Sequence, residues 1–582
     1  MRTLSALRCA ALLVLSGAAC SRGAKSDLGV DRTVEAGLPV ALGAGDDETL
    51  WDTGEGGKPF AAEKAVHVFQ RSGVFTVRAL REGTERSRVK LTVVPRPVLR
   101  AIPGDADGVL FVPALAGNID ALVSFSETLL GADSAQRAFQ QFPLASLVLE
   151  ALGRGTPATG TVDPQEGMAV FTLPDFEGAV GLVGVQDEKA SLASVVEEAR
   201  ETGATARLEG GLTVLQAPDG FTFALFADRG YLYAVHPGDR LEPERFVKAA
   251  AGVQAHVKSA RPAGLSENAR LAALRARTGP GNLFLFFGNR PEHVEAKDGV
   301  EAFFGAMQVA QGRLGLDGLL ATRGPLFPPA GRFPTLLGQA PQGPIGALQL
   351  TLPPQQLGAL VFGAPDSPRR ERARQSFAEA GVTAEELIGA FRGDVGLLVY
   401  FDAPAFFANL VRGSSRPEPR GTILLEMGLS NRAPVEKFIQ KQLEASPTRV
   451  EVFRERDSVR YRARLFEQTV DVSLAGDRLV VNAGEVIRNR KMGDLAALLR
   501  TRSAGQAFAP GQASLFIDFG ELRQEINAPK QVPGVPDERL AAVQAFASSF
   551  LDQLTPFDHA FLNLSPEAGG ARLKGEVILR GP

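Results

Sequence analysis

The sequence predicts a multidomain protein in which a small all-β sandwich precedes two tandem α+β modules with largely antiparallel sheets. Three observations support this fold class. The chain has 582 residues, and this length is too great for one ordinary core. Hydrophobic residues make up 45% of it. Short alternating strands separated by glycine turns occupy the N-terminal part. A pattern of apolar run, amphipathic helix and several short strands then occurs twice.

The first residues have the features of an export signal. Arg2 and Arg8 form a basic start, and the apolar stretch from Cys9 to Leu15 is too short to cross a bilayer as a mature helix. We therefore predict that residues 1–19 are a signal peptide.

Leu15-Ser-Gly-Ala-Ala-Cys20 resembles the lipobox of bacterial lipoproteins, although Gly17 stands where a large aliphatic residue is usual. The resemblance implies that Cys20 is lipidated and that the chain has a membrane as partner through this N-terminal anchor, with residues 20–27 as a tether. The only other cysteine is Cys9, inside the leader, so no disulfide partner for Cys20 remains after cleavage. Ser21, by resemblance to the enterobacterial sorting rule, favours the outer over the inner membrane. The alternative is an ordinary leader that ends beside a chance cysteine.

Residues 28–96 are expected to form the all-β sandwich. Trp51-Asp-Thr-Gly-Glu-Gly56 and the run from Val66 to Val77 resemble the two motifs of the polycystic-kidney-disease (PKD) domain, which has an immunoglobulin-like fold. Thr53 and Glu55 depart from that pattern. The resemblance implies a spacer or an interaction module, with Trp51 between the sheets.

The two modules are expected at residues 98–327 and 335–582. An apolar run at Gly178–Val185 leads into a helix at Ser191–Ala199, and Thr422–Met427 leads into a helix at Pro434–Leu443. Val300–Met307 and Val543–Phe550 are expected to be equivalent closing helices. The layout resembles a family of exported bacterial proteins known only as a domain of unknown function, and this resemblance implies no activity.

Several classes of chemistry lack their sequence signature. None of the five histidines has the spacing of a metal site, and no phosphate-binding loop or nucleophile elbow is present. A net charge of -3 without a basic stripe argues against nucleic acid as a partner. We therefore predict no catalytic residue, no metal and no cofactor.

Two features could bind a partner. Phe303, Phe304, Phe406 and Phe407 form aromatic pairs that could contact an apolar ligand, although paired phenylalanines more often fill a core. The arginines between Arg449 and Arg464 could bind an anion, but alternating charges on strands more often form cross-strand ion pairs.

The sequence thus favours an exported, membrane-anchored, non-catalytic lipoprotein of the bacterial cell envelope with a binding or structural role. The first alternative is a carrier of lipid or another apolar ligand. The second alternative is a cell-wall hydrolase that uses carboxylates on loops, since acidic pairs are common in any sequence.

Overall fold

The structure of the chain is a computed structural model. It describes residues 28 and 30–580 apart from residues 70–72, 95, 131–161, 219, 221, 238–242, 261–262, 289–299, 311, 324–334, 364–366, 412–420, 445–449, 466–467, 485–490, 496, 498, 500–507, 509–511, 528–531, 533–534 and 553–555. The expected signal peptide, the tether and Cys20 lie outside the described residues.

The N-terminal domain is a β-sandwich. Its larger sheet has the strand order β1 (Arg32–Glu35), β7 (Thr84–Val94), β6 (Gly73–Arg81), β3 (Thr49–Asp52) and β4 (Phe60–Ala61), and β2 (Pro39–Ala44) pairs with β5 (Lys64–Val68) in the smaller sheet. Trp51 is completely buried between them and donates a hydrogen bond from Nε1 to the carbonyl of Ala62 at 2.8 Å. The indole therefore fills the core as expected, with its polar group satisfied.

The sandwich is tied to the first module by two buried tyrosines of strand β14 (Tyr231–Pro237). The Tyr231 hydroxyl donates to the carbonyl of Arg96 at 2.9 Å, and the Tyr233 hydroxyl donates to the carbonyl of Ala101 at 2.8 Å. The guanidinium of Arg96 lies 4.8 Å from the centre of the Tyr231 ring. These contacts fix the segment that leaves the sandwich, including α2 (Val98–Ala101), against the first module.

The first module contains β8 (Gly108–Val112), α3 (Ile119–Leu130), β9 (Met168–Thr172), β10 (Gly178–Gly184), α6 (Glu188–Glu201), β11 (Thr205–Glu209), β12 (Leu212–Gln216), β13 (Thr222–Asp228), β14, α7 (Pro243–Ser259), η1 (Gly264–Glu267), α8 (Ala269–Arg275), β15 (Leu283–Phe287), β16 (Val300–Ala310) and β17 (Arg313–Thr322).

The second module contains η2 (Thr335–Leu337), β18 (Ala340–Pro341), β19 (Gly346–Thr351), α10 (Pro354–Phe362), α11 (Pro368–Glu379), α12 (Ala384–Gly389), β20 (Phe391–Phe401), α13 (Ala403–Val411), β21 (Gly421–Leu429), α14 (Arg432–Glu444), β22 (Val450–Arg454), β23 (Ser458–Leu465), β24 (Gln468–Ala475), β25 (Arg478–Ala483), β26 (Met492–Gly493), β27 (Ala513–Asp518), α16 (Phe519–Asn527), α17 (Asp537–Asp552), β28 (Phe557–Glu567) and β29 (Gly570–Leu579).

The two modules have the same strand order. In the first it is β11, β12, β13, β14, β10, β9, β8, β15, β16, β17. In the second it is β22, β23, β24, β25, β21, β20, β19, β27, β28, β29. All of these pairings are antiparallel, which confirms the expected α+β modules. The amphipathic helices α6 and α14 occur where the repeated sequence pattern places them.

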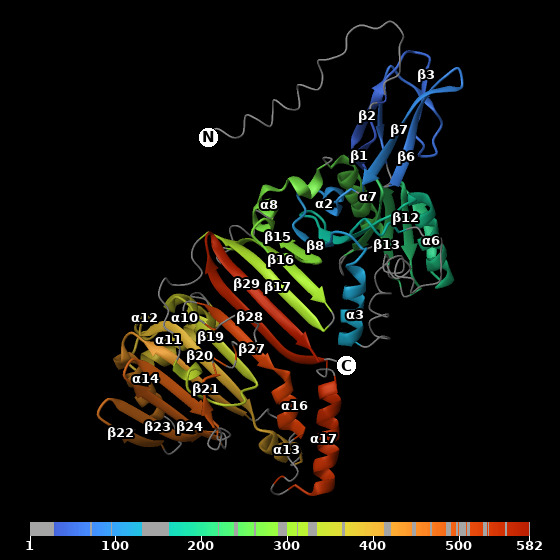
Figure 1. The fold of residues 1–582 in the computed structure, drawn as a ribbon. Helices are drawn as coiled ribbons and strands as arrows, with labels where there is room; N and C mark the ends of the chain where they lie inside the picture. Colours follow the sequence, from blue (N-terminus) through green and yellow to red (C-terminus); the bar gives the residue numbers. More distant parts are fainter. Residues whose placement is uncertain are drawn as a thin grey trace, which may run out of the picture.

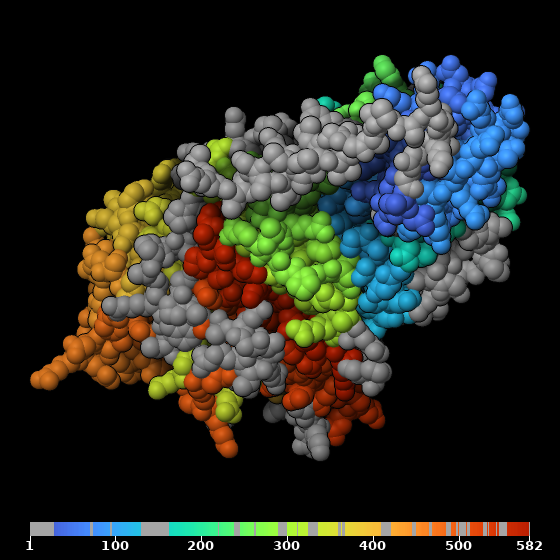
Figure 2. Space-filling view, turned by 45° about the horizontal axis from the view of Figure 1, so that its top comes forward, coloured from blue at the N-terminus to red at the C-terminus, as the bar shows by residue number. Residues whose placement is uncertain are grey.

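The modules join edge to edge through their last strands, which we call the seam. Residues 313–321 of β17 pair antiparallel with residues 570–578 of β29, so one sheet runs through both modules (Figure 1). Because equivalent strands meet antiparallel, the modules are related by an approximate two-fold axis through the seam. Figure 2 shows the first module (green) and the C-terminal strands (red) directly against each other.

An ion pair reinforces the seam. Arg572 of β29 donates from Nε and Nη2 to the two carboxylate oxygens of Asp317 of β17, at 2.9 and 2.7 Å. The backbone N–H of Gly279 donates to the same carboxylate at 2.7 Å. This two-pronged geometry is the strongest form of a side-chain ion pair.

Helices cover both faces of the outer strands of the first module. One core places Phe246 and Ala250 of α7 against Phe226 and Tyr233. A second core on the other side of the same strands contains Val195 of α6 with Leu225, Leu232 and Val123 of α3. Strands that are covered on both faces carry apolar side chains at odd and even positions alike.

The expected closing helix at Val300–Met307 is wrong, because these residues form the start of strand β16. Its counterpart in the second module is β28, whereas Val543–Phe550 do lie in a helix, α17. Adjacent phenylalanines, Phe303 and Phe304, point to opposite faces of the sheet, and both faces there are apolar. The run therefore lacks the alternation that distinguishes a strand from a buried helix.

Candidate functional site

The central strands on both sides of the seam present one apolar face. Successive paired residues carry it from strand to strand: Leu110 of β8 pairs with Leu285 of β15, and Phe287 of β15 pairs with Phe303 of β16. We call it the leucine face, and it consists of Leu110, Leu285, Phe287, Phe303, Met307, Leu316, Leu573, Leu562, Leu515, Leu348, Leu397, Leu425 and Ile423. It crosses ten strands.

The leucine face is partly open to solvent. Five of its side chains, Leu110, Phe287, Leu515, Leu562 and Ile423, are between 38% and 49% exposed. The others are half-buried. Soluble monomers rarely expose a contiguous apolar area of more than a few hundred Å², so the leucine face is the candidate binding surface of this chain.

Glycines flatten the leucine face at the seam. Gly305, Gly318 and Gly575 occupy the apolar side of β16, β17 and β29. A Cβ atom at Gly318 would lie 2.7 Å from Cε2 of Phe303, and one at Gly305 would lie 2.9 Å from Cζ of the same ring. The Phe303 ring therefore lies flat across both glycines, and only glycine leaves room for it.

The opposite face differs between the modules at equivalent positions. A row across the first module contains Ala306, Phe284 and Phe111, and the two rings stack with centroids 5.1 Å apart. The equivalent row of the second module contains Asn563, Ser514 and Gln349, all buried, and Asn563 donates to Ser514 Oγ at 2.9 Å. The leucine face is thus the apolar surface that the two modules share.

Among the phenylalanines expected to contact a ligand, only Phe303 lies on the leucine face. Phe304 is completely buried in the core of the first module. Phe407 is completely buried in a separate cluster, and Phe406 packs against Phe401 with ring centroids 5.3 Å apart. The two aromatic pairs therefore do not form one site, and Phe304 and Phe407 fill cores.

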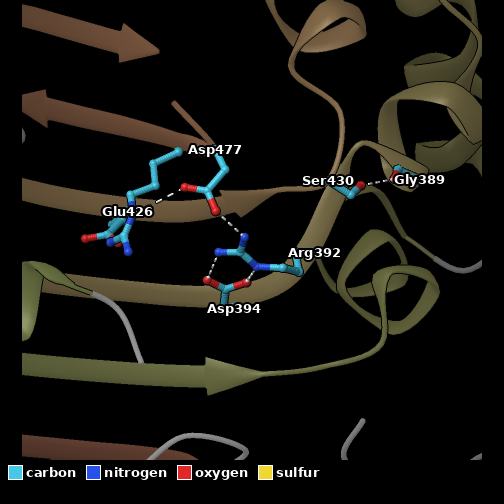
Figure 3. Close-up of polar contacts among 7 residues, drawn as sticks. Gly389, Arg392, Asp394, Glu426, Ser430 and Asp477 are labelled. Atoms are coloured by element: carbon cyan, nitrogen blue, oxygen red, sulfur yellow. Dashed lines mark hydrogen bonds and ion pairs between the residues drawn. The ribbon is translucent and has the colours of Figure 1, made fainter. Parts of the chain in front are cut away.

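Three neighbouring carboxylates of the second module, Asp394, Asp477 and Glu426, are held in ion pairs. Arg392 donates to both oxygens of Asp394 at 2.7 and 2.8 Å and to Asp477 at 2.7 Å (Figure 3). The hydrogen bond from Arg392 lowers the pKa of Asp477. Nearby, Arg478 pairs with the buried Glu426. A Cβ atom at Gly428 would lie 2.2 Å from an oxygen of Asp394, so a glycine is required for this contact. This network connects β20, β21 and β25 and has the character of a structural clamp.

The arginine-rich run behaves as expected for a charged sheet face. Arg460 and Arg462 of β23 both donate to Asp471 of the neighbouring strand β24, at 2.8 Å for the shortest bond of each. Burial by itself would raise the pKa of Asp471, but the hydrogen bonds from Arg462 and Arg460 outweigh burial and lower this pKa. Cross-strand pairing therefore accounts for these arginines.

An open cavity of about 380 Å³ lies where β8, β9, β10 and β15 meet, beside the leucine face. Asp107 and Glu177 contribute carboxylates, and Phe176 and Phe287 contribute rings to its wall. The neighbouring Asp105 is paired with Nε2 of His256 at 2.9 Å. Among the described residues, no three histidine, cysteine, aspartate or glutamate side chains converge as a metal ion would require.

In the part of the chain that the structure describes, no helix combines the length and the apolar composition needed to traverse a bilayer.

Comparison with protein-family models gives no match, and comparison with curated proteins gives none either. Among solved structures, crystal form III of TP0453 is similar with a TM-score of 0.24 and 11% identity, over 39% of this chain and 80% of that chain. Crystal form IV gives a TM-score of 0.25 and 10% identity over 39% and 80%, and crystal form I gives 0.22 and 10% over 39% and 78%. Similarity at this level assigns neither a fold nor a function.

The leucine face is the feature that sequence reasoning missed. Its signal is present, for example in the alternation of leucine and glycine at Leu314-Gly-Leu-Asp-Gly-Leu-Leu320. Which of the two faces such an alternation exposes depends on strand neighbours that lie far away in the sequence.

Proposed function

We propose that this chain is a lipid-anchored, non-catalytic protein of the bacterial cell envelope, and that the leucine face is its binding surface. The anchor is Cys20, and the outer membrane is the favoured location. The PKD-like sandwich serves as the spacer between the anchor and the two modules.

The observation that carries the binding role is the extent of the leucine face. It crosses the seam without interruption and spans four strands of the first module and six of the second, so it is a property of the joined sheet and not of one module alone. Exposed leucines cost solubility, and their accumulation on one face is expected where another apolar surface covers them.

The anchor is tested by metabolic labelling with a palmitate analogue. The wild-type chain should take up the label, and a Cys20→Ala variant should not, because the thiol is the acylation site. A Cys9→Ala variant is the matched control and should be labelled like the wild type. Label on the Cys20→Ala chain would remove the anchor from the proposal.

The carrier alternative is favoured by the same apolar face but needs an enclosure, since ligand pockets bury most of their ligand. Native mass spectrometry of the gently extracted protein distinguishes the two. A co-purifying lipid at constant stoichiometry would favour a carrier, and a bare chain would favour a surface that binds another protein surface.

The hydrolase alternative has one specific observation in its favour, the cavity that Asp107 and Glu177 line together. A paired change, Asp107→Asn with Glu177→Gln, should abolish any release of soluble fragments from purified cell wall. Equal release by the variant, or no release by the wild type, would contradict this alternative.

A further inference from the structure

We infer that the leucine face binds the leucine face of a second copy of this chain, with seam over seam. The inference depends on the proposed function only in taking this face as the binding surface. It adds the identity of the partner.

The chemistry of the face restricts the partner. The thirteen side chains that define it are leucine, isoleucine, methionine and phenylalanine, with no hydrogen-bonding group among them. Interfaces with a different protein usually contain tyrosine, tryptophan or arginine at their centre, with polar groups that specify the partner. A surface without such groups is matched by a second surface without them, and this chain supplies one.

The shape of the face also fits a copy of itself. Gly305, Gly318 and Gly575 keep the seam flat, with the Phe303 ring lying along the sheet. Two flat sheets pack face to face about 10 Å apart, with interdigitating side chains. When one seam lies over the other, the flat strip around Gly305, Gly318 and Gly575 contacts the same strip of the second copy, which is the isologous contact of a two-fold dimer.

The available area is sufficient for a stable dimer. Ten strands at about 4.8 Å spacing give a width of roughly 45 Å. The thirteen side chains together with apolar residues beside them on the same face, such as Leu283, Leu320 and Leu564, make about three rows and a height of roughly 20 Å, so each copy offers roughly 900 Å². Stable protein interfaces bury about 800 Å² per partner. If one copy were shifted along the other by the width of one module, about half of this area would stay uncovered. We therefore place one seam over the other.

A membrane surface is a less suitable partner. The most exposed side chains of the face are 38–49% exposed and belong to strands in the middle of a sheet, not to a projecting loop or helix. To reach hydrocarbon they would have to pass the lipid headgroups, whereas interfacial anchors project apolar side chains by several Å.

The first experiment measures the mass of the Cys20→Ala chain, expressed without its leader, by sedimentation equilibrium. We expect a dimer, and we expect Leu562→Asp to weaken it by at least about tenfold, because the charge would be buried in an apolar contact. Lys574→Ala, on the opposite face of the adjacent strand, is the matched control and should leave the dimer unchanged. Circular dichroism shows whether each variant is folded.

The second experiment uses a conservative change. The Cys20→Ala chain without its leader contains no cysteine, so Leu316→Cys introduces a single thiol at the seam. A short bifunctional maleimide should join two copies through it, and it should not join copies that carry Lys574→Cys instead. This variant remains informative if Leu562→Asp fails to fold.

Two outcomes would overturn the inference. One is a monomeric Cys20→Ala chain, and the other is a dimer that Leu562→Asp does not weaken and Leu316→Cys does not crosslink. If the monomer also floats with phosphatidylcholine vesicles, the face is a lipid-binding surface. None of them affects the labelling of Cys20, so failure of this inference and failure of the anchor are distinguishable.

Discussion

The ion pair at the seam should contribute measurably to the union of the two modules. Asp317 and Arg572 come from strands of different modules, and their side chains are only 21% and 26% exposed. Two parallel hydrogen bonds between charged groups, at 2.7 and 2.9 Å, join them. We propose the change Arg572→Met, which keeps the aliphatic part of the side chain and removes the guanidinium.

The expected magnitude follows from what remains after the change. A fully buried pair broken on one side costs about 3–5 kcal/mol, because the remaining charge is left without a partner. Here Asp317 keeps the hydrogen bond from the Gly279 N–H and some contact with water. We therefore expect Arg572→Met to cost about 2 kcal/mol of unfolding free energy, and a coupling of about 1–2 kcal/mol with Asp317→Asn.

The assay is a double-mutant cycle on Asp317→Asn, Arg572→Met and the double variant, measured by urea unfolding of the Cys20→Ala chain. The pair Arg323 and Glu301 is the control, since it is 3.1 Å apart but 53% and 30% exposed and lies within one module. It should show about 0.5 kcal/mol or less. A coupling of the seam pair no larger than that of the control would refute this reasoning.

Three further predictions concern single buried side chains. In the same urea unfolding, Phe304→Ala should lower the unfolding free energy by about 3–5 kcal/mol, because Phe304 is completely buried. Phe303→Ala should lower it clearly less, because Phe303 lies on the half-open leucine face. Equal losses would contradict the assignment of the two side chains to opposite faces. Burial raises the pKa of Glu166 to about 9, above its unfolded value, so the folded chain should lose stability as pH rises from about 4.5 through 9. Glu166→Gln should reduce this loss and stabilise the chain at pH 8 by roughly 2–4 kcal/mol, while an unchanged pH profile of unfolding would show that Glu166 ionises normally. Trp51→Phe should lower the midpoint of thermal unfolding of the sandwich, since it removes both ring volume and the hydrogen bond to Ala62. An unchanged midpoint in scanning calorimetry, which does not depend on the indole signal, would contradict this role.

The repeated pattern predicted the modules because it depends on local periodicity. Val195 in α6 and Val435 in α14 are buried by the same helical spacing that the sequence shows. Short separation in the sequence also explains why Trp51 was placed correctly. The same holds for the ion pairs of Arg460 and Arg462 with Asp471, because these residues lie on consecutive strands.

The misassigned element has an equally local cause. Val300–Met307 contains apolar residues at both alternating sets of positions, since Phe304 faces the core and Phe303 faces the leucine face. Periodicity separates strand from helix only where one face is polar. The phenylalanine pair therefore had the pattern of a buried helix although it lies in a strand.

The sequence by itself determined the all-β sandwich, the duplicated α+β modules and the helices that carry their apolar stripes, because residues within a few positions of one another define each of these. Only the tertiary structure decided that β17 and β29 join the modules, that leucines from ten strands share one face, and that Asp317 meets Arg572 across the seam. Strand pairing between segments more than two hundred residues apart follows from which edges remain free after each module folds, and no local pattern encodes that choice.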